Sequence, residues 1–263
     1  LDQSIEVLQC ATAHRGYQSR GQDITWAVLD TGIDPRHPHF NSGTCSNVEK
    51  VYDCMEPGPI KEREAKAGRG AGYDGNGHGT HVAGIIAGGI PNLNMWGIAP
   101  AVRLRSYKVL DDDGVGSDAK IIKALDHVYD VNRNASSLVI HGVNLSLGGP
   151  FDPESFGCGD TPICKQLRRL WRQGVVVVLA AGNEGYLELQ QGDEMLGINT
   201  DLSIGDPANL DEAIVVGSIH KSKPHLSGLF SYSSRGPTAD GRAKPDVVPP
   251  GERIWSCRAG ATV

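Results

Sequence analysis

The sequence predicts an α/β fold built on a mostly parallel β-sheet, and two features carry this prediction. The first is a series of short apolar runs rich in Val, Ile and Leu, each followed by glycine or a turn. These runs cover residues 24–30, 102–110, 142–149, 175–183 and 213–219. Continuous apolar runs of this length are typical of strands buried on both faces of a parallel sheet.

The second feature is helical spacing between the runs. After Ser117, which can cap a helix, apolar residues recur three or four positions apart as far as Tyr129. The segment 165–173 repeats this spacing, and Gly174 would end that helix. Strands that alternate with helices form α/β folds. No internal repeat or low-complexity linker divides the sequence, so we expect a single domain over residues 1–263.

Composition excludes two classes of partner. The formal net charge is -6 and no long basic run occurs, so the chain lacks the electrostatic signature of a nucleic-acid-binding protein. The longest uninterrupted apolar run, 175–181, is far shorter than the roughly 20 residues of a membrane-spanning helix. We therefore expect no nucleic-acid partner and no membrane span.

The six cysteines leave two interpretations open. Cys45 with Cys54, and Cys158 with Cys164, have spacings that suit short disulfide loops in an exported protein. Scattered free thiols fit the sequence equally well.

The charged segment 61–75 is predicted to be a solvated loop. It contains Gly70, Gly72 and Gly75 in a GxGxxG pattern, but a dinucleotide-binding fingerprint requires a strand immediately before it. A charged run precedes the glycines here, so we keep the loop interpretation.

Polar residues or glycines stand at the ends of several predicted strands, at the edge of an open parallel sheet where ligands usually bind. Asp30 ends the first run, Gly148 and Gly149 end the third and Asn183 ends the fourth. A helix that begins near His78, directly after the glycine-rich loop, would bring an imidazole to the same edge. We expect these groups to converge.

Such a set of groups has a specific chemistry. An aspartate that accepts a hydrogen bond from one imidazole nitrogen leaves the other nitrogen free to take a proton from a nucleophile. This makes His78 a candidate general base oriented by Asp30. The amide of Asn183 could donate to a developing oxyanion. A metal bound to His78 and His81 would need further ligands, and neither an HExxH nor a paired carboxylate motif is present.

Five stretches resemble the signatures of the subtilisin family of serine proteases. They are "AVLDTGID", "GHGTHVAG", "NLSLGGP", "AAGNEG" and "SSRGPTADGRAKPDVVPPG", and together they cover nearly the whole chain. The resemblance implies a three-layer subtilisin-like fold, with helices on both faces of a central mostly parallel sheet. It also implies hydrolysis of peptide bonds through an Asp/His/Ser triad, in the chain order known for subtilisin. Asp30 would be the orienting acid, His78 the general base, Asn183 the oxyanion donor and His81 a structural residue.

The resemblance further implies how a polypeptide substrate is held. An extended peptide can add as a strand to an exposed backbone edge, with side-chain pockets that give specificity. The residues that match the family's two edge segments and the walls and base of its primary pocket are Gly114, Val115, Gly116, Ser146, Leu147, Gly148, Ala180, Ala181, Gly182 and Gly205. Glu184 and Asp206 near that pocket suggest a preference for basic side chains. Pro207 matches a position where the family holds a cis proline.

The sequence departs from the family at a common calcium site. His39 stands where many members have an aspartate, and Pro91 lies in the loop that would supply further ligands. Imidazole is a poor ligand for calcium, which prefers carboxylate and carbonyl oxygens. We therefore expect no calcium at this site, although calcium elsewhere remains open, and no cofactor for the chemistry itself.

A second departure concerns the nucleophile. The family's Gly-Thr-Ser motif is absent, and Ser231, Ser233 and Ser234 match a different segment. Cys257 follows the strand-like 253–255 and matches no nucleophile motif. Without a nucleophile no acyl-enzyme forms, so we expect this chain alone to be inactive.

The sequence therefore suggests the larger part of a catalytic domain, with a companion segment that carries the serine. The start at Leu1 suggests a processed or excised chain. A catalytically inactive, subtilisin-like binding or regulatory module is the alternative. By family resemblance, an exported location is expected.

Overall fold

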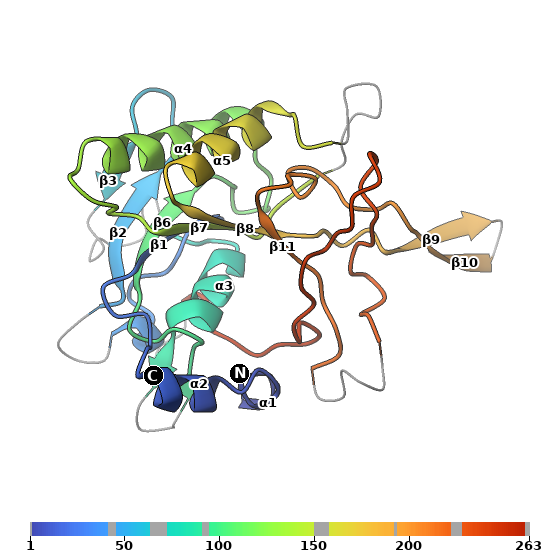
Figure 1. Ribbon diagram of the computed structural model, residues 1–263, viewed down its shortest axis with the longest axis horizontal. Coiled ribbons are helices and arrows are strands. Elements are labelled where there is room, and N and C mark those ends of the chain that lie inside the picture. The colour runs from blue at the N-terminus through green and yellow to red at the C-terminus, as the bar shows by residue number, and fades with distance from the viewer. Residues whose placement is uncertain are drawn as a thin grey trace.

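A computed structural model describes residues 2–41, 46–63, 73–90, 95–149, 158–191, 194–221 and 228–260. Its centre is a seven-stranded sheet in the order β11-β8-β7-β1-β6-β2-β3 (Figure 1). The strands are β1 (Thr25–Asp30), β2 (Val48–Asp53), β3 (Lys61–Arg63), β6 (Arg103–Lys108), β7 (Gly142–Leu145), β8 (Val176–Ala180) and β11 (Ile214–Val216). All neighbouring strands pair in parallel except β2 and β3, which are antiparallel. The prediction of a mostly parallel sheet is confirmed.

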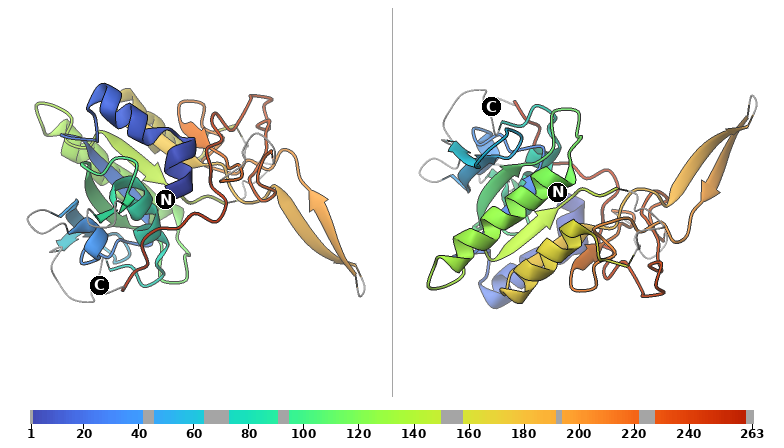
Figure 2. Two further views of the ribbon diagram at one scale, coloured as in Figure 1. Left: turned by 90° about the horizontal axis from the view of Figure 1, so that it is seen from below. Right: turned by 90° about the horizontal axis from the view of Figure 1, so that it is seen from above.

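Helices cover both faces of this sheet. Two lie side by side on one face, α4 (Asp118–Arg133) and α5 (Pro162–Arg172), while α3 (His78–Ala87) packs on the opposite face against β1 and β6 (Figures 1 and 2). Two short helices precede the sheet, α1 (Asp2–Val7) and α2 (Cys10–Tyr17), and a 3-10 turn, η1, spans Pro38–Phe40. This arrangement has the three layers expected.

The alternation of side chains along β1 explains the two cores. Ala27 and Leu29 pack in the larger core under α4 and α5, whereas Val28 packs in the smaller core under α3. All three side chains are fully buried. A strand with apolar residues on both faces therefore joins the two layers, as its continuous apolar sequence predicts.

Both predicted helices form, with small differences. Ser117 is the N-cap residue of α4, but its side chain makes no capping hydrogen bond. Helix α5 begins earlier than the sequence suggests, because Thr161 caps it and Pro162 occupies its first turn. It ends before Gly174, whose φ of 95° is the left-handed conformation that glycine adopts at helix ends.

A β-hairpin that we did not predict projects from the body of the molecule (Figure 2). It pairs β9 (Tyr186–Gln191) with β10 (Glu194–Asn199) in antiparallel register. Two further short strands, β4 (Gly89–Ile90) and β5 (Met95–Trp96), also pair antiparallel.

The disulfide suggested between Cys158 and Cys164 is wrong, because both thiols are free. Cys164 points inward from α5, and its sulfur lies 3.7 Å from the carbonyl oxygen of Pro207. Cys54 is also a free thiol, whereas Cys45 lies outside the described residues. Of the glycine pattern, Gly75 alone is described.

The segment 253–255, which the sequence suggested to be strand-like, forms no strand. Cys257, just after it, is buried in the smaller core. A side chain at Gly84 on α3 would collide with its sulfur, so this part of the chain lies directly on α3.

Within the described ranges, no helix has both the length and the apolar composition required to cross a membrane.

Candidate active site

The central feature of the site is a contact between the end of β1 and the start of α3. The Nδ1 atom of His78, the first residue of α3, lies 2.7 Å from Oδ1 of Asp30, the last residue of β1. The carboxyl group of Asp30 is fully buried, while the side chain of His78 is 49% exposed. Because a carboxylate oxygen only accepts, Nδ1 carries the proton and Nε2 is left as the acceptor.

Asp30 makes one further hydrogen bond, in which the backbone N–H of Thr31 donates to its Oδ1 at 2.7 Å. Its other oxygen, Oδ2, is buried and has no hydrogen-bond partner among the described residues. The hydrogen bond to Asp30 is the main cause that raises the pKa of His78 above its ordinary value, while partial burial acts to lower the pKa. The negative charges of Asp30 and Asp74 raise it further.

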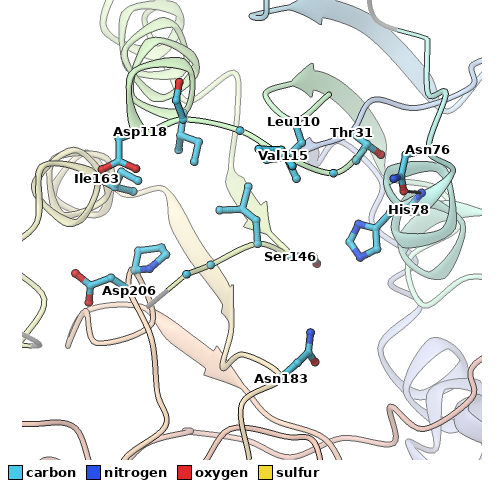
Figure 3. A pocket seen from close by; sticks show the side chains of 18 of the residues that line it. Thr31, Asn76, His78, Leu110, Val115, Asp118, Ser146, Ile163, Asn183 and Asp206 are labelled. Carbon is cyan, nitrogen blue, oxygen red and sulfur yellow. Dashed lines mark hydrogen bonds between the residues drawn. The ribbon is translucent and has the colours of Figure 1, made fainter. Parts of the chain in front are cut away.

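A cleft with a volume of about 800 Å³ begins at His78 and runs between two loop segments (Figure 3). One wall is the loop 114–116 before α4, and the other is the segment 146–149 after β7. The six residues predicted for the edge segments all line it, namely Gly114, Val115, Gly116, Ser146, Leu147 and Gly148. Asn183, which follows β8, lines the same cleft, and its side chain points into it (Figure 3).

The other predicted pocket residues gather in a smaller, adjoining pocket of about 70 Å³. Ala180, Ala181, Gly182 and Gly205 line it, together with the segment 146–149. A Cβ atom on Gly205 would collide with the carbonyl oxygen of Gly149, so glycine allows these two segments to approach closely. The structure thus brings together the residues that the sequence suggested for substrate binding.

The two acidic residues near this pocket, Glu184 and Asp206, have different hydrogen-bond partners. Oε2 of Glu184 accepts hydrogen bonds from the backbone N–H of Asn183 at 2.7 Å and from Oγ of Ser234 at 2.8 Å. This carboxylate lies beside Gly182, in the lining of the pocket. Asp206 also lines this pocket, and its Oδ1 accepts a hydrogen bond from the side chain of Asn209 at 2.9 Å. In the larger cleft, Asp206 lies at the end remote from His78 (Figure 3). The Asp206–Pro207 peptide bond is cis.

His81, three residues after His78, lies outside the cleft. Its Nε2 donates a hydrogen bond to the carbonyl oxygen of Ile254, at 3.1 Å. Across the described ranges, no group of three His, Cys, Asp or Glu residues has a geometry that could hold a metal ion.

The serines that the sequence singled out have other partners. Ser233 and Ser234 are buried, and the hydroxyl of Ser233 accepts a hydrogen bond from the backbone of Ser218. Among the described residues, the ring of His78 is hydrogen-bonded only to Asp30, and no serine hydroxyl is bound to its Nε2.

Sequence reasoning missed two groups of residues around the site. Leu110, Ile121 and Ile163 give the cleft part of its apolar lining, but in the sequence they look like ordinary core residues. Asp74 and Thr31 bind the first turn of α3, and no motif in the sequence singles them out for that role.

The comparisons agree with this geometry. Residues 21–262 match the family model of the subtilase family. The chain is 31% identical to serine protease AprX of Bacillus subtilis (strain 168) over 268 residues, which covers 98% of this chain and 53% of that protein. It is also 31% identical to subtilisin E of the same strain, over 92% of this chain and 50% of that protein. The chain therefore belongs to the subtilase family, and it spans about half the length of these curated relatives.

Solved structures support the same fold. Sphericase superimposes with a TM-score of 0.70 at 27% identity, over 92% of this chain and 70% of that chain. S41 psychrophilic protease superimposes with a TM-score of 0.69 at 28% identity, over 91% of this chain and 70% of that chain. The predicted three-layer, subtilisin-like fold is confirmed.

Proposed function

We propose that this chain supplies the acid, the base and the oxyanion donor of a serine endopeptidase of the subtilisin type. The observation that carries the proposal is the 2.7 Å contact between Nδ1 of His78 and Oδ1 of Asp30, at one end of a cleft that Asn183 also lines. With Nδ1 bound to Asp30, Nε2 takes the proton of a serine hydroxyl as its oxygen attacks the substrate carbonyl. The amide of Asn183 donates to the resulting oxyanion, and His78 then gives its proton to the leaving amine.

A polypeptide is the substrate that fits the cleft. An extended peptide between the segments 114–116 and 146–149 can form backbone hydrogen bonds with both, as a strand does in a sheet. Its side chain at the cleavage position would enter the pocket beside Glu184. Because Glu184 directly follows Asn183, whereas Asp206 lies at the end of the cleft remote from His78, we expect any preference for a basic side chain to come from Glu184. Cleavage rates of matched Arg, Phe and Leu peptides by wild type and Glu184→Gln measure this preference.

The nucleophile, in this proposal, comes from a companion segment outside these 263 residues. Two observations support it: no serine is bound to His78 among the described residues, and part of the sheet is uncovered. On the face where α3 lies, Val176 of β8 and Ile214 of β11 are 41% and 43% exposed. Strands with such continuous apolar sequences are normally covered on both faces. A companion segment packed beside α3 would cover this face and could present a serine to His78.

Hydrolysis of a peptide substrate by the native protein, with every polypeptide it contains, tests the proposal. His78→Ala should lower kcat by about 10⁶, and Asn183→Ala by about 10² to 10³. These are the losses known for the corresponding groups of subtilisin, a member of the same family. Asn134→Ala, at an exposed site at the end of α4, is the control and should leave kcat unchanged. Equal rates for His78→Ala and wild type would refute the proposal.

The alternative is a catalytically inactive binding or regulatory module. The absence of a serine at His78 within the described residues favours it. Such a module would bind peptides in the cleft without cleaving them, and mutation of Leu147 rather than His78 would weaken that binding.

We also propose that calcium does not bind in the loop that follows α3. His39 lies close to this region, because a Cβ on Gly88 would be 3.2 Å from its Nδ1. Burial lowers the pKa of His39, which leaves a neutral imidazole rather than a carboxylate at this position. Residues 91–94 lie outside the described residues. We expect no calcium to be located in this loop, and a calcium-dependent rise in Tm with metal located there would overturn the proposal. An exported location is also proposed, on the family resemblance alone.

A further inference from the structure

The first turn of α3 is held by side chains from outside the helix. Its N-cap residue, Gly77, has no side chain that could accept a hydrogen bond. The free N–H groups of the turn are bound instead by three other residues. The N–H of His78 donates to Asn76 at 3.2 Å, that of Gly79 to Oγ1 of Thr31 at 3.0 Å, and that of Thr80 to Oδ2 of Asp74 at 2.8 Å.

Asp74 is the centre of this network. It is 1% exposed, and its Oδ1 accepts from the N–H of Gly77 at 2.7 Å and from the hydroxyl of Thr31 at 2.8 Å. A buried carboxylate is costly unless it is hydrogen-bonded, and this one has three donors at the positive end of a helix. Its loss would leave several buried donors without partners.

Thr31 connects this network to the acid of the pair. Its N–H donates to Oδ1 of Asp30, the same oxygen that faces His78. Its hydroxyl donates to Asp74 and accepts from Gly79. Its carbonyl oxygen accepts from Nζ of the buried Lys108 at 2.6 Å. Thr31 is therefore fixed on three sides, and it links the strand that carries the acid to the helix that carries the base.

We propose that Asp74 and Thr31 are positioning residues that hold the first turn of α3 so that His78 meets Asp30. The side chain of His78 is half exposed, so packing around the ring restricts its position only in part. The position of the ring therefore depends on the backbone of the first turn of α3. The catalytic meaning of this inference rests on the proposed function, whereas the geometric claim does not.

The protonation of His78 provides a readout that a purely structural cap would not change. The charged groups that act on its pKa are Asp30 on β1 and Asp74 before α3, while His81 is its neighbour on the same helix. Replacing Asp74 removes a charge as well as hydrogen bonds, so its effect mixes the two causes. Thr31→Val removes no charge. A change in the pKa of His78 in Thr31→Val therefore reports a weakened contact with Asp30.

Thr238 offers a matched control far from His78 in sequence and bonded to other residues. It is as buried as Thr31, and its hydroxyl likewise donates to a carboxylate, Asp240, and accepts from a backbone N–H, that of Arg242. Thr238→Val thus removes hydrogen bonds of the same kind, but the bonds that it removes do not involve α3.

The experiment is an NMR titration of the His78 ring in the native protein, with peptide hydrolysis measured on the same samples. We expect the pKa of His78 to fall toward its ordinary value in Thr31→Val and Asp74→Asn, and to stay unchanged in Thr31→Ser and Thr238→Val. In the first two variants kcat should fall by about 10²-fold, since small misplacements of a catalytic group have effects of that size.

An unchanged His78 titration in Thr31→Val would overturn the inference, as would an equal change in Thr238→Val. If Asp74→Asn fails to fold, the Thr31 variants still decide the question. If the titrations shift as expected but no variant or wild type hydrolyses peptides, the positioning role stands and the proposed function fails.

Discussion

His78 and Asp30, 48 residues apart in the chain, meet through a single hydrogen bond of 2.7 Å that joins the start of α3 to the end of β1. One partner is fully buried and the other half exposed. This asymmetry suits an acid–base pair, because the carboxylate is shielded from water while the far nitrogen of the imidazole remains accessible to a substrate.

The pH dependence of stability should reveal this contact. The hydrogen bond to Asp30 raises the pKa of His78 in the folded state above its ordinary value of 6.5. A histidine with a raised folded pKa stabilises the protein fully below its unfolded pKa, and this stabilisation is lost as the pH rises through the folded pKa.

We therefore expect the difference in unfolding free energy between wild type and His78→Ala to be largest in acid and to shrink as the pH rises above 6.5. Urea unfolding at a series of pH values measures it. Peptide hydrolysis should show the opposite trend, because only the neutral imidazole can accept a proton. A stability difference that grows with pH would contradict the assigned contact.

Gly79 should tolerate no side chain. A Cβ atom there would overlap the carbonyl oxygen of Gly32 and lie 3.1 Å from Oδ1 of Asp30. We expect Gly79→Ala to destabilise the protein by about 1–3 kcal/mol, because the helix must move away from β1. Thermal or urea unfolding provides the measurement.

Gly16, in α2, is the matched control, since a Cβ atom there would meet nothing within 4 Å. Gly16→Ala should be neutral or stabilise the helix by up to about 1 kcal/mol. Equal effects at the two glycines would show that α3 does not lie as close to β1 as described.

Ser234 should support the loop that carries Asn183. Its hydroxyl donates to Glu184 at 2.8 Å and accepts from the N–H of Glu184 at 3.1 Å. We expect Ser234→Ala to cost about 1–3 kcal/mol, because the carboxylate and the N–H of Glu184 both lose a partly buried hydrogen bond. It should also lower kcat more than it raises KM, since the oxyanion donor is needed in the transition state. Ser231→Ala, at an exposed neighbour, should change stability by less than about 0.5 kcal/mol.

A substitution at Val176 tests whether a companion segment covers the sheet face around it in the native protein. If a companion segment packs there, Val176→Lys places a charge in an apolar interface and should destabilise the native protein strongly, by several kcal/mol. If the face is open to water, the change should stay within about 0.5 kcal/mol. Leu202→Lys is the control, since Leu202 is 58% exposed in a loop. A small effect at Val176 would argue against a companion at this face.

Much of the fold could be predicted because its strands and helices have strong periodic signals. The apolar run at 24–30 becomes β1, and the glycine-rich loop ends where α3 begins, at His78. These signals are local, since they depend on the 2.0 and 3.6 residue repeats of strands and helices.

The hairpin of β9 and β10 was missed although its sequence alternates. Leu187 and Leu189 pair with Ile198 and Leu196 across the two strands, so apolar residues share one face. All four side chains remain exposed. A search for strands buried in a core therefore does not find this hairpin.

The network around Asp74 was missed for a different reason. Asp74 and Thr31 are 43 residues apart, and their contact exists only once β1 and α3 have packed together. Spacing along the chain cannot reveal such pairs. The sequence left open whether Cys158 and Cys164 form a disulfide for a similar reason, because the spacing of two cysteines does not show that Cys164 faces inward from α5.

The most direct test of the central claim is to find which serine reacts in the native protein. The protein would be treated with a fluorophosphonate, digested, and the modified serine located by mass spectrometry, in wild type and in His78→Ala. We expect the label to lie on a serine in a segment outside residues 1–263, and His78→Ala to abolish labelling. Label on a serine within these residues, such as Ser234, or no label anywhere in the native protein, would contradict the central claim.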